Sequence, residues 1–317
     1  MAHVYTSLAD LIKINDANLA DIDDMSDLLQ EAPFLAALAA EVASNGTQHK
    51  YTVENGAPTV GFRAVNAGRE NKASSDRLVT ADLAILAASF IADQQLAKTY
   101  KKGEAAYMFR EGKRHLKEAF AMNEKQIFYG TGTGGDSTGF GGLAQAETVD
   151  ALADADHVVN AGGSTVGGAT SVWAIRSTDD GRDVQAIIGQ EGEIDIAEYF
   201  PQMMLDGDGK HYPAFVCPIE GYTGLQIGSI WSFARIVNLT TQEGKGLTDS
   251  LLSQLLERFP SAKPPTHLVM NRQSGFQLQR SRTATTESGK DAELPKEYQN
   301  IPIILTDSIL KTEALVA

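Results

Sequence analysis

The chain has 317 residues, of which 43% are hydrophobic and 21% charged, a composition typical of a soluble globular protein with two lobes or one lobe with long extensions. It contains no run of about 20 apolar residues that could span a membrane, its first residues lack the pattern of a signal peptide, and its single cysteine, Cys217, fits a reducing cytoplasm. The formal net charge of −14 argues against a protein that gathers nucleic acid by its own charge.

The first 32 residues are predicted to form an acidic arm. They hold seven acids and one base, Lys13, which is the reverse of a basic arm that condenses nucleic acid. Pro33 then predicts the start of a short helix from Phe34 to Val42, because proline is favoured in a first helical turn and alanine and leucine are good helix formers. Turn residues at 44–46 are expected to end this helix.

A long hairpin with a polar tip is predicted next. Apolar and polar residues alternate with period two from His49 to Val53, and the alternation resumes at Val60, Phe62 and Ala64. A polar stretch, 66–77, separates these residues from a second extended stretch, 78–91, whose latter half would also suit a helix. An isolated two-stranded ribbon has too little apolar surface to be stable in water. The ribbon therefore needs a partner, and the pattern alone is equally compatible with its own domain or another molecule.

The clearest predicted element is a helix from Gly103 to Phe128. Its apolar residues recur with helical spacing on one face, with charged residues opposite, and its length would be about 39 Å. It is expected to stop at Gly130, the first glycine of the sequence Gly-Thr-Gly-Thr-Gly-Gly. A dinucleotide-binding fingerprint needs a strand before its glycines and a helix after them, so we interpret this segment as a flexible connector.

The rest of the chain is predicted to be a mixed region of short strands and two helices. One helix is expected from Thr248 to Phe259 and a shorter one through Phe276 and Leu278, with a polar loop from Ser281 to Pro295. The runs that predict strands are Ser171–Ile175, Val184–Ile188, Ile194–Tyr199, Ala214–Cys217, Gln226–Leu239, His267–Met270, Ile301–Leu305 and Ile309–Val316.

No set of residues has the spacing of a catalytic, cofactor or metal site. The segment from Asp206 to Lys210 begins like a calcium loop but lacks the later ligands, and is read as a turn. The six histidines are dispersed. Cys217 is expected to be a core thiol, and Trp173 and Trp231 to be core or subunit-contact residues. The sequence therefore predicts neither enzymatic activity nor a cofactor.

Three short regions and the order of the elements resemble a known family. They are the hairpin entry, Asn45–Tyr51 running into Gly56–Arg63; the helix end Lys125–Gly130 followed by Gly139–Leu143; and the junction Leu268–Arg272. Together with the arm, hairpin, long helix and mixed lobe, they resemble the major capsid protein of tailed bacteriophages, with the α+β fold of the Hong Kong 97 type. This resemblance implies four parts: an N-terminal arm (1–45), an extended hairpin called the E-loop (46–92), a peripheral domain with the spine helix (93–149, rejoined by 301–317) and an axial domain (150–300).

The same resemblance implies a function and partners. The chain would assemble through pentamers and hexamers into an icosahedral shell enclosing double-stranded DNA, without sequence-specific DNA binding and without a membrane. It would occur in the virion and be assembled in the host cytoplasm. Implied partners are further copies of itself, a scaffolding protein and a portal, with a decoration protein as a further candidate.

The family also suggests where copies touch. The expected inter-subunit contacts are the charged residues of the hairpin tip, namely Arg69, Glu70, Lys72, Asp76 and Arg77. Some members cross-link such a lysine to an asparagine of the next subunit, and here the positional candidates are Lys72 with Asn271 or Asn300. Two other functions stay open from the sequence. One is an encapsulin-like nanocompartment shell around a cargo enzyme, and the other is an enzyme that binds a nucleotide through the glycine-rich segment.

Overall fold

The structure, a computed structural model, describes residues 13–14, 29–56, 58–70, 72–189, 193–284 and 292–317. Most of the predicted acidic arm therefore lies outside the described residues, as does part of the predicted loop at 281–295. Within the described part of the chain, no helix is long and apolar enough to cross a membrane.

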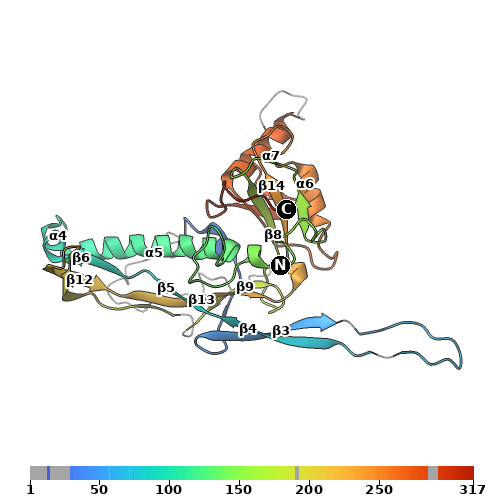
Figure 1. Cartoon of the computed structure of the whole chain (residues 1–317), viewed down its shortest axis with the longest axis horizontal. Helices are drawn as coiled ribbons and strands as arrows, with labels where there is room; N and C mark the ends of the chain where they lie inside the picture. Colours follow the sequence, from blue (N-terminus) through green and yellow to red (C-terminus); the bar gives the residue numbers. More distant parts are fainter. Residues whose placement is uncertain (1–12, 15–28, 57, 71, 190–192, 285–291) are drawn as a thin grey trace.

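One lobe of the molecule is built along a single long helix, α5 (Glu104–Tyr129). The helix lies along a twisted sheet, with the short helix α4 (Gln94–Thr99) at its far end (Figure 1). The main sheet has the order β1-β10-β13-β9-β2 with β5 also paired to β13, and a smaller sheet has the order β11-β12-β6. The bounds of these strands are β1 Lys13–Ile14, β2 Ala40–Val42, β5 Ala84–Ala87, β6 Phe90–Asp93, β9 Val184–Ile188, β10 Glu193–Ile196, β11 Phe200–Leu205, β12 His211–Cys217 and β13 Ile219–Ile227.

The second lobe stands beside the C-terminal end of α5 (Figure 1). It is a sheet of order β16-β17-β15-β8-β14-β7 packed with α6 (Asp249–Leu256) and α7 (Arg272–Ala284). Its apolar core includes Leu252, Leu255, Leu268 and Leu278. The strands are β7 Val158–Asn160, β8 Thr170–Ile175, β14 Phe233–Leu239, β15 His267–Met270, β16 Glu297–Tyr298 and β17 Ile301–Leu305.

A two-stranded hairpin leaves the body of the molecule and points away from both lobes (Figure 1). It consists of β3 (Gln48–Gly56) and β4 (Ser75–Asp82), paired antiparallel from Gln48 opposite Asp82. The base of the hairpin is held by hydrogen bonds, from Leu83 N to Thr47 O (3.0 Å) and from Ser44 N to His49 Nδ1 (3.2 Å). These two strands form a sheet of their own, which agrees with the two-stranded ribbon predicted from the sequence.

The long helix confirms its prediction within one residue at each end. Its buried residues include Met108, Leu116, Phe120 and Ile127, which repeat with the expected helical spacing. The helix ends at Gly130, whose φ of 56° is a conformation that glycine adopts without strain.

The glycine-rich segment after α5 is tightly packed, so the expectation of a flexible connector is wrong. Gln126 Nε2 donates to Phe140 O (2.8 Å), and Asp136 N donates to Gln126 Oε1 (2.7 Å). A Cβ at Gly135 would collide with the carbonyl oxygen of Gly130. The glycines are thus needed for close approach of the backbone, and side chains from α5 fill the turn.

Several predicted elements have different bounds or types. The predicted helix Phe34–Val42 is a short helix, α3 (Pro33–Ala37), followed by β2, because the chain turns extended at Leu38 and pairs with β9. The region of Val60–Ala64 is not a strand, and the second half of 78–91 is strand rather than helix because it pairs with β13 and β12. The predicted strand Gln226–Leu239 is two strands separated by a turn at Ile230–Ser232.

Near the C-terminus two further expectations differ. The helix α7 continues to Ala284, so the predicted loop begins later than Ser281. The predicted strand Ile309–Val316 is irregular, with only an isolated bridge between Glu313 and Ala169. Strand pairing also crosses two of the predicted domain limits. β5 and all but the last residue of β6 lie before residue 93, whereas their partners β13 and β12 follow residue 150.

Glu124 is a carboxylate fully buried where three segments meet, which the sequence did not single out. It accepts hydrogen bonds from Phe34 N (2.8 Å), Leu35 N (2.9 Å) and the hydroxyl of Thr306. Burial raises the pKa of Glu124, and the hydrogen bonds, that from Thr306 first, offset only part of this rise. The helix, the start of α3 and the end of β17 are therefore joined by a group that resists ionisation.

We expect the stability of the fold to depend on pH through Glu124. Because the folded state keeps this proton to a higher pH than the unfolded state, the free energy of unfolding falls as pH rises from the ordinary carboxyl value through the raised one. Glu124→Gln is expected to remove this fall, as measured by urea unfolding over a pH series. Glu118→Gln, on the exposed side of α5, is the control and should leave the fall intact. Parallel pH profiles for Glu124→Gln and the parent chain would contradict the assignment.

Candidate subunit interfaces

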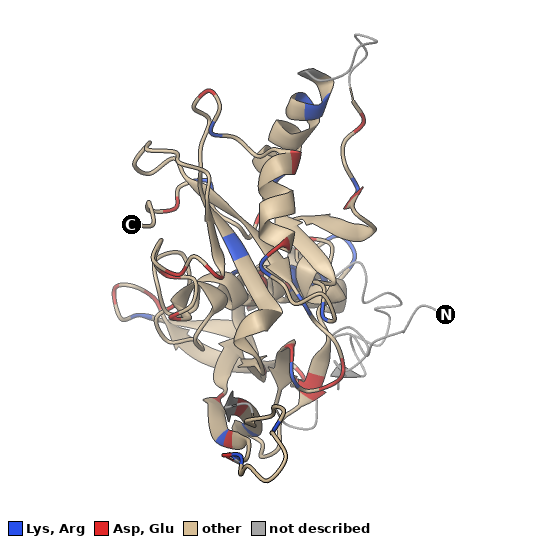
Figure 2. Ribbon diagram, turned by 90° about the vertical axis from the view of Figure 1, so that its right-hand side faces the viewer, with Lys and Arg blue, Asp and Glu red and all other residues tan. Residues whose placement is uncertain are grey.

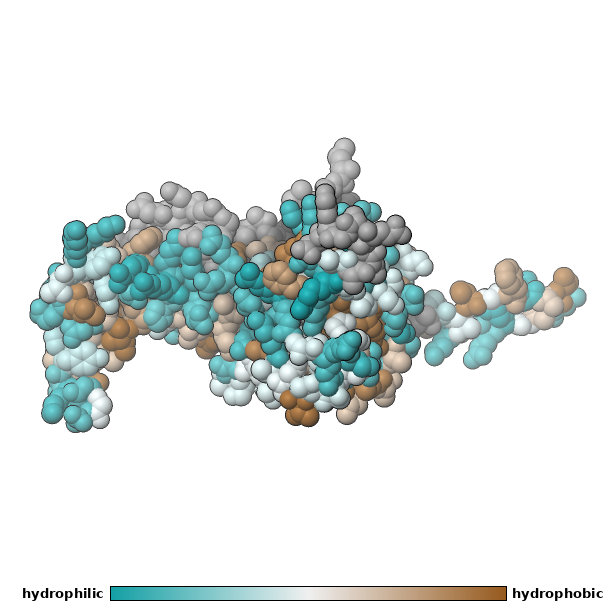
Figure 3. Space-filling model, turned by 90° about the horizontal axis from the view of Figure 1, so that it is seen from above, coloured by the Kyte–Doolittle hydropathy of each residue, from teal (hydrophilic) through white to brown (hydrophobic). Residues whose placement is uncertain are grey.

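The loop between β3 and β4 exposes a cluster of apolar side chains. In this hairpin loop, residues 58–70 and 72–74, Val60 is 81% exposed, Phe62 106% and Val65 91%. Brown, hydrophobic residues are visible along the projecting arm in Figure 3. Large apolar side chains clustered at the end of a projecting loop are typical of surfaces that another molecule covers.

Arg69 gives this loop its shape. Its guanidinium donates hydrogen bonds to the backbone oxygens of Gly61 (3.0 Å), Glu70 (3.2 Å) and Thr59. Thr59 N also donates to Lys72 O (3.0 Å), which closes the two limbs of the loop. Arg69 thus ties the limbs of its own loop together and holds the apolar residues outward.

The five charged residues predicted as contacts lie in two settings. Glu70 and Lys72 are exposed in the loop beside Arg69, whereas Asp76 and Arg77 lie in β4 opposite Glu54 and Val53. The structure brings them all to the same arm. The exposed apolar side chains of Val60, Phe62 and Val65 are further candidate contacts, which the sequence prediction did not include, although the alternation at Val60 and Phe62 was a signal for two of them.

The candidates for a cross-link to Lys72 differ in access. Asn271 is buried, and its side-chain amide donates to Ile309 O. Asn300 is exposed in the turn between β16 and β17, with φ at 63°. The side-chain amide of Asn271 is therefore already bonded to the C-terminal segment at Ile309.

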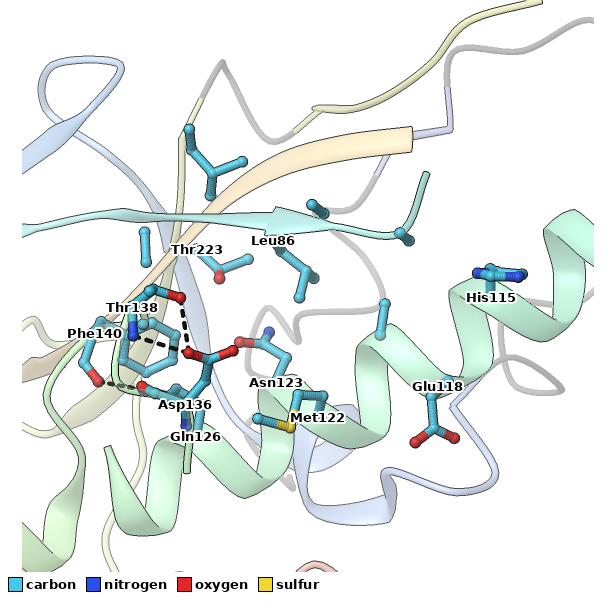
Figure 4. A pocket seen from close by; sticks show the side chains of 16 residues that line it. Leu86, His115, Glu118, Met122, Asn123, Gln126, Asp136, Thr138, Phe140 and Thr223 are labelled. Atoms are coloured by element: carbon cyan, nitrogen blue, oxygen red, sulfur yellow. Dashed lines mark hydrogen bonds between the residues drawn. The ribbon is translucent and has the colours of Figure 1, made fainter. Parts of the chain in front are cut away.

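A groove of about 380 Å³ opens between α5, β5 and the turn at 136–140 (Figure 4). Leu86, Met122 and Phe140 provide apolar walls, and Glu118 and His115 lie at the end of the groove nearer to α4. Asn123 is 5% exposed and its Oδ1 has no hydrogen-bond partner among the described residues. A buried acceptor without a partner is costly, so the groove is suited to a ligand that donates a hydrogen bond.

The groove also carries negative charge. Hydrogen bonds from the backbone (2.9 Å) and the hydroxyl (2.7 Å) of Thr138 lower the pKa of Asp136. Glu118 is the second acid, and the described lining residues include no lysine or arginine. The hairpin loop has the opposite charge, with three bases, Arg63, Arg69 and Lys72, against one acid, Glu70. Loop and groove are therefore complementary in charge, and both have an apolar centre.

A second apolar surface crosses the small sheet on its outer side. Ile91 of β6 lies opposite Val216 of β12, which lies opposite Phe200 of β11, and Ile91 and Phe200 are about half exposed. Ile85 on β5 is exposed as well. In the view of Figure 2, acidic and basic residues are interspersed along the ribbon.

The two tryptophans, Cys217 and the segment 206–210, which the sequence singled out, pack against other residues or form a turn. Trp173 is fully buried, and Trp231 is 41% exposed and lies against the ring of His157 (centroid distance 4.6 Å). Cys217 is buried in the core, as predicted. Asp206 and Lys210 close a turn through the bond from Asp206 N to Lys210 O (2.9 Å). Among the residues that the structure describes, no cluster of histidine, cysteine and acidic residues could hold a metal ion.

Comparison with known families identifies the chain. The model of the family described as "Major capsid protein GP7" matches residues 16–317. The chain belongs to this family. It is a structural protein of an icosahedral bacteriophage capsid, and its fold is of the Hong Kong 97 type, as the sequence motifs suggested.

One solved bacteriophage structure supports the fold. A chain from the near-atomic structure of bacteriophage Epsilon15 is 17% identical, with 100% of this capsid protein and 98% of that chain covered and a TM-score of 0.60. A chain of the bacteriophage JBD30 capsid is 10% identical, with 89% and 93% covered and a TM-score of 0.46. No curated protein sequence matches the chain.

Proposed function

We propose that this capsid protein assembles through pentamers and hexamers in which the hairpin loop of each copy docks on the α5 groove of its neighbour. One observation carries the proposal: Val60, Phe62 and Val65 project from the body on a ribbon that only pairs with itself. Burying an exposed phenylalanine contributes about 1.5–3 kcal/mol, and the charges of loop and groove favour the same pairing. Arg69 prepares the loop by fixing its shape before contact, which lowers the entropy cost of docking.

The charge of the chain supports a proposal about how the shell is filled. A coat protein with a formal charge of −14 does not attract DNA, so double-stranded DNA would be driven in through a portal rather than condensed by the coat. No sequence-specific DNA contact is proposed. A scaffolding protein would guide assembly in the host cytoplasm, a decoration protein is a further candidate, and the finished shell is part of the virion.

The strand pairing supports a revised division of the family's four parts. We assign the N-terminal arm to 1–45 and the E-loop to the β3–β4 hairpin. The peripheral domain then takes α4, α5 and the strands β5, β6 and β9 to β13, which form two sheets, and β1 and β2 of the arm add to one of these sheets. The axial domain takes the sheet of β7, β8 and β14 to β17 with α6 and α7.

A shortened hairpin tests the docking. Residues 60–71 are replaced by Asn-Gly, a favoured tight turn, between Thr59 and Lys72, which already hydrogen-bond across the loop. We expect a folded, soluble subunit that sediments as a small species, while the parent chain forms shells visible by electron microscopy. Shells of normal size from the shortened chain would refute the docking. Parent shells containing a cargo protein and no DNA would instead indicate a nanocompartment.

A further inference from the structure

A basic groove lies along the exposed side of α5, away from the groove described above. It is lined by Tyr100, Lys102, Ala106, Phe109, Arg110, Lys113, Arg114 and Lys117. Five of these residues are basic and, among the described lining residues, none is acidic. Hydrophilic side chains gather along α5 in Figure 3. Such a concentration of positive charge stands out on a chain whose formal charge is −14.

Two arginines of the groove are held in place by aromatic and acidic side chains. The guanidinium of Arg110 lies over the rings of Tyr100 (4.7 Å) and Tyr107 (5.2 Å). Glu111 bonds to both Arg110 (2.9 Å) and Arg114 (2.9 Å). One carboxylate is thus shared by two arginines, and the five basic residues that line the groove outnumber this one acid.

The same chain contains a segment of matching opposite charge. Residues 15–28 hold five acids, Asp16, Asp21, Asp23, Asp24 and Asp27, and no base. The groove thus has five basic residues and this segment five acidic ones. Complementary charge of this kind directs which surfaces associate.

Both ends of the acidic segment are attached close to α5. Before it, β1 pairs with β10 in the sheet along the helix, and after it, Leu29 is buried in the core that contains Phe34 and Phe128. The residues between Ile14 and Leu29 can span at most about 50 Å when extended. From Phe128 back to Lys117 is about 17 Å along the helix axis, so the segment can reach the groove without leaving its own subunit.

We propose that the basic groove of α5 binds the acidic segment 15–28 of the same chain, and that this contact shields the groove from polyanions. The lysines and arginines then hold the arm to the subunit and do not bind nucleic acid. Removing the negative charge of the arm would expose a binding surface for DNA. The inference does not depend on the docking of the hairpin loop, because it concerns a single subunit.

The test uses full-length chains that differ only in charge. In the arm variant, Asp16, Asp21, Asp23, Asp24 and Asp27 are changed to asparagine, which keeps the size of each side chain. The matched control changes five acids elsewhere to their amides, namely Asp150, Asp156, Asp206, Asp208 and Glu243. Both variants lose the same negative charge. Binding of a short fluorescein-labelled double-stranded DNA is then measured by anisotropy over a salt series.

We expect the arm variant to bind DNA about tenfold more tightly than the parent at low salt, with the difference shrinking as salt rises. The control should bind no more tightly than the parent. Adding Lys113→Gln and Lys117→Gln to the arm variant should remove the gain, and a synthetic peptide of residues 15–28 should displace the DNA. An equal gain in arm variant and control, no gain in either, or a gain that survives the two lysine changes would each overturn the proposal.

Discussion

Replacing Glu313 by alanine is expected to lower the free energy of unfolding by about 3–5 kcal/mol, the usual cost of leaving a buried charge without its partner. Arg235 and Glu313 form an ion pair (2.8 Å) with side chains only 6% and 5% exposed. Tyr129 at the end of α5 donates to the other carboxylate oxygen of Glu313 (2.5 Å). Ser171 donates to the carboxylate as well, and Arg235 Nε donates to Ser171 Oγ (2.9 Å).

This large loss of stability is expected because the hydrogen-bond network around Glu313 lies between the two lobes. It joins the end of α5, the sheet of the second lobe and the C-terminal segment. Arg235 would be left facing Trp173, over whose ring it lies at 4.8 Å, without a counter-ion. Urea unfolding is measured on chains with the shortened hairpin, so that assembly does not contribute to stability.

Two further variants separate charge from packing. Glu313→Gln keeps the shape and is expected to lose less than the alanine variant. The pair Arg235→Met with Glu313→Leu fills the site with apolar groups, and we expect it to recover most of the loss, because well-packed apolar replacements of buried ion pairs are often tolerated. If the alanine variant were as stable as the parent, the ion pair would not couple the lobes.

Local pattern was enough to predict the long helix and the hairpin. The apolar stripe of α5 and the period-two alternation of β3 depend on residues close together in sequence. The role of Glu124 could not be predicted in this way, since its partners Phe34 and Thr306 are 90 and 182 residues away. A glutamate on a helix is normally read as solvent-exposed. Only the folding of α3 and the end of β17 against α5 makes it a buried acceptor.

That the hairpin tip makes inter-subunit contacts stays a prediction. The sequence indicated that the hairpin needs a partner, because an isolated ribbon is too thin, and charged residues were expected to make the contact. In the structure Arg69 binds its own loop, and the apolar side chains of Val60 and Phe62 are exposed in the same loop. The groove proposed to receive the loop could not be predicted from the sequence, because its walls come from β5, α5 and the turn around Phe140.

Replacing Phe62 by aspartate is expected to abolish shell assembly while the subunit stays folded. Each copy would present one such loop to one neighbour, so every contact in a ring loses the same side chain. The loss is about 1.5–3 kcal/mol for the phenylalanine, to which the cost of burying a carboxylate against Asp136 and Glu118 is added. Because Phe62 has no contact that contributes to the core of its own subunit, the melting temperature of the unassembled chain should not change. Sedimentation velocity and electron microscopy measure the assembly.

The control places the same charge in the same loop without removing an apolar group. Asn66 is exposed with φ at 62°, a conformation that aspartate also tolerates, so Asn66→Asp tests charge alone and should still assemble. Phe62→Leu keeps an apolar side chain and should assemble with reduced efficiency. If Phe62→Asp and Asn66→Asp failed equally, the loop would act through its charge. If Phe62→Asp assembled normally, the apolar contact would be excluded and the half-exposed row around Ile91 and Phe200 would become the leading interface.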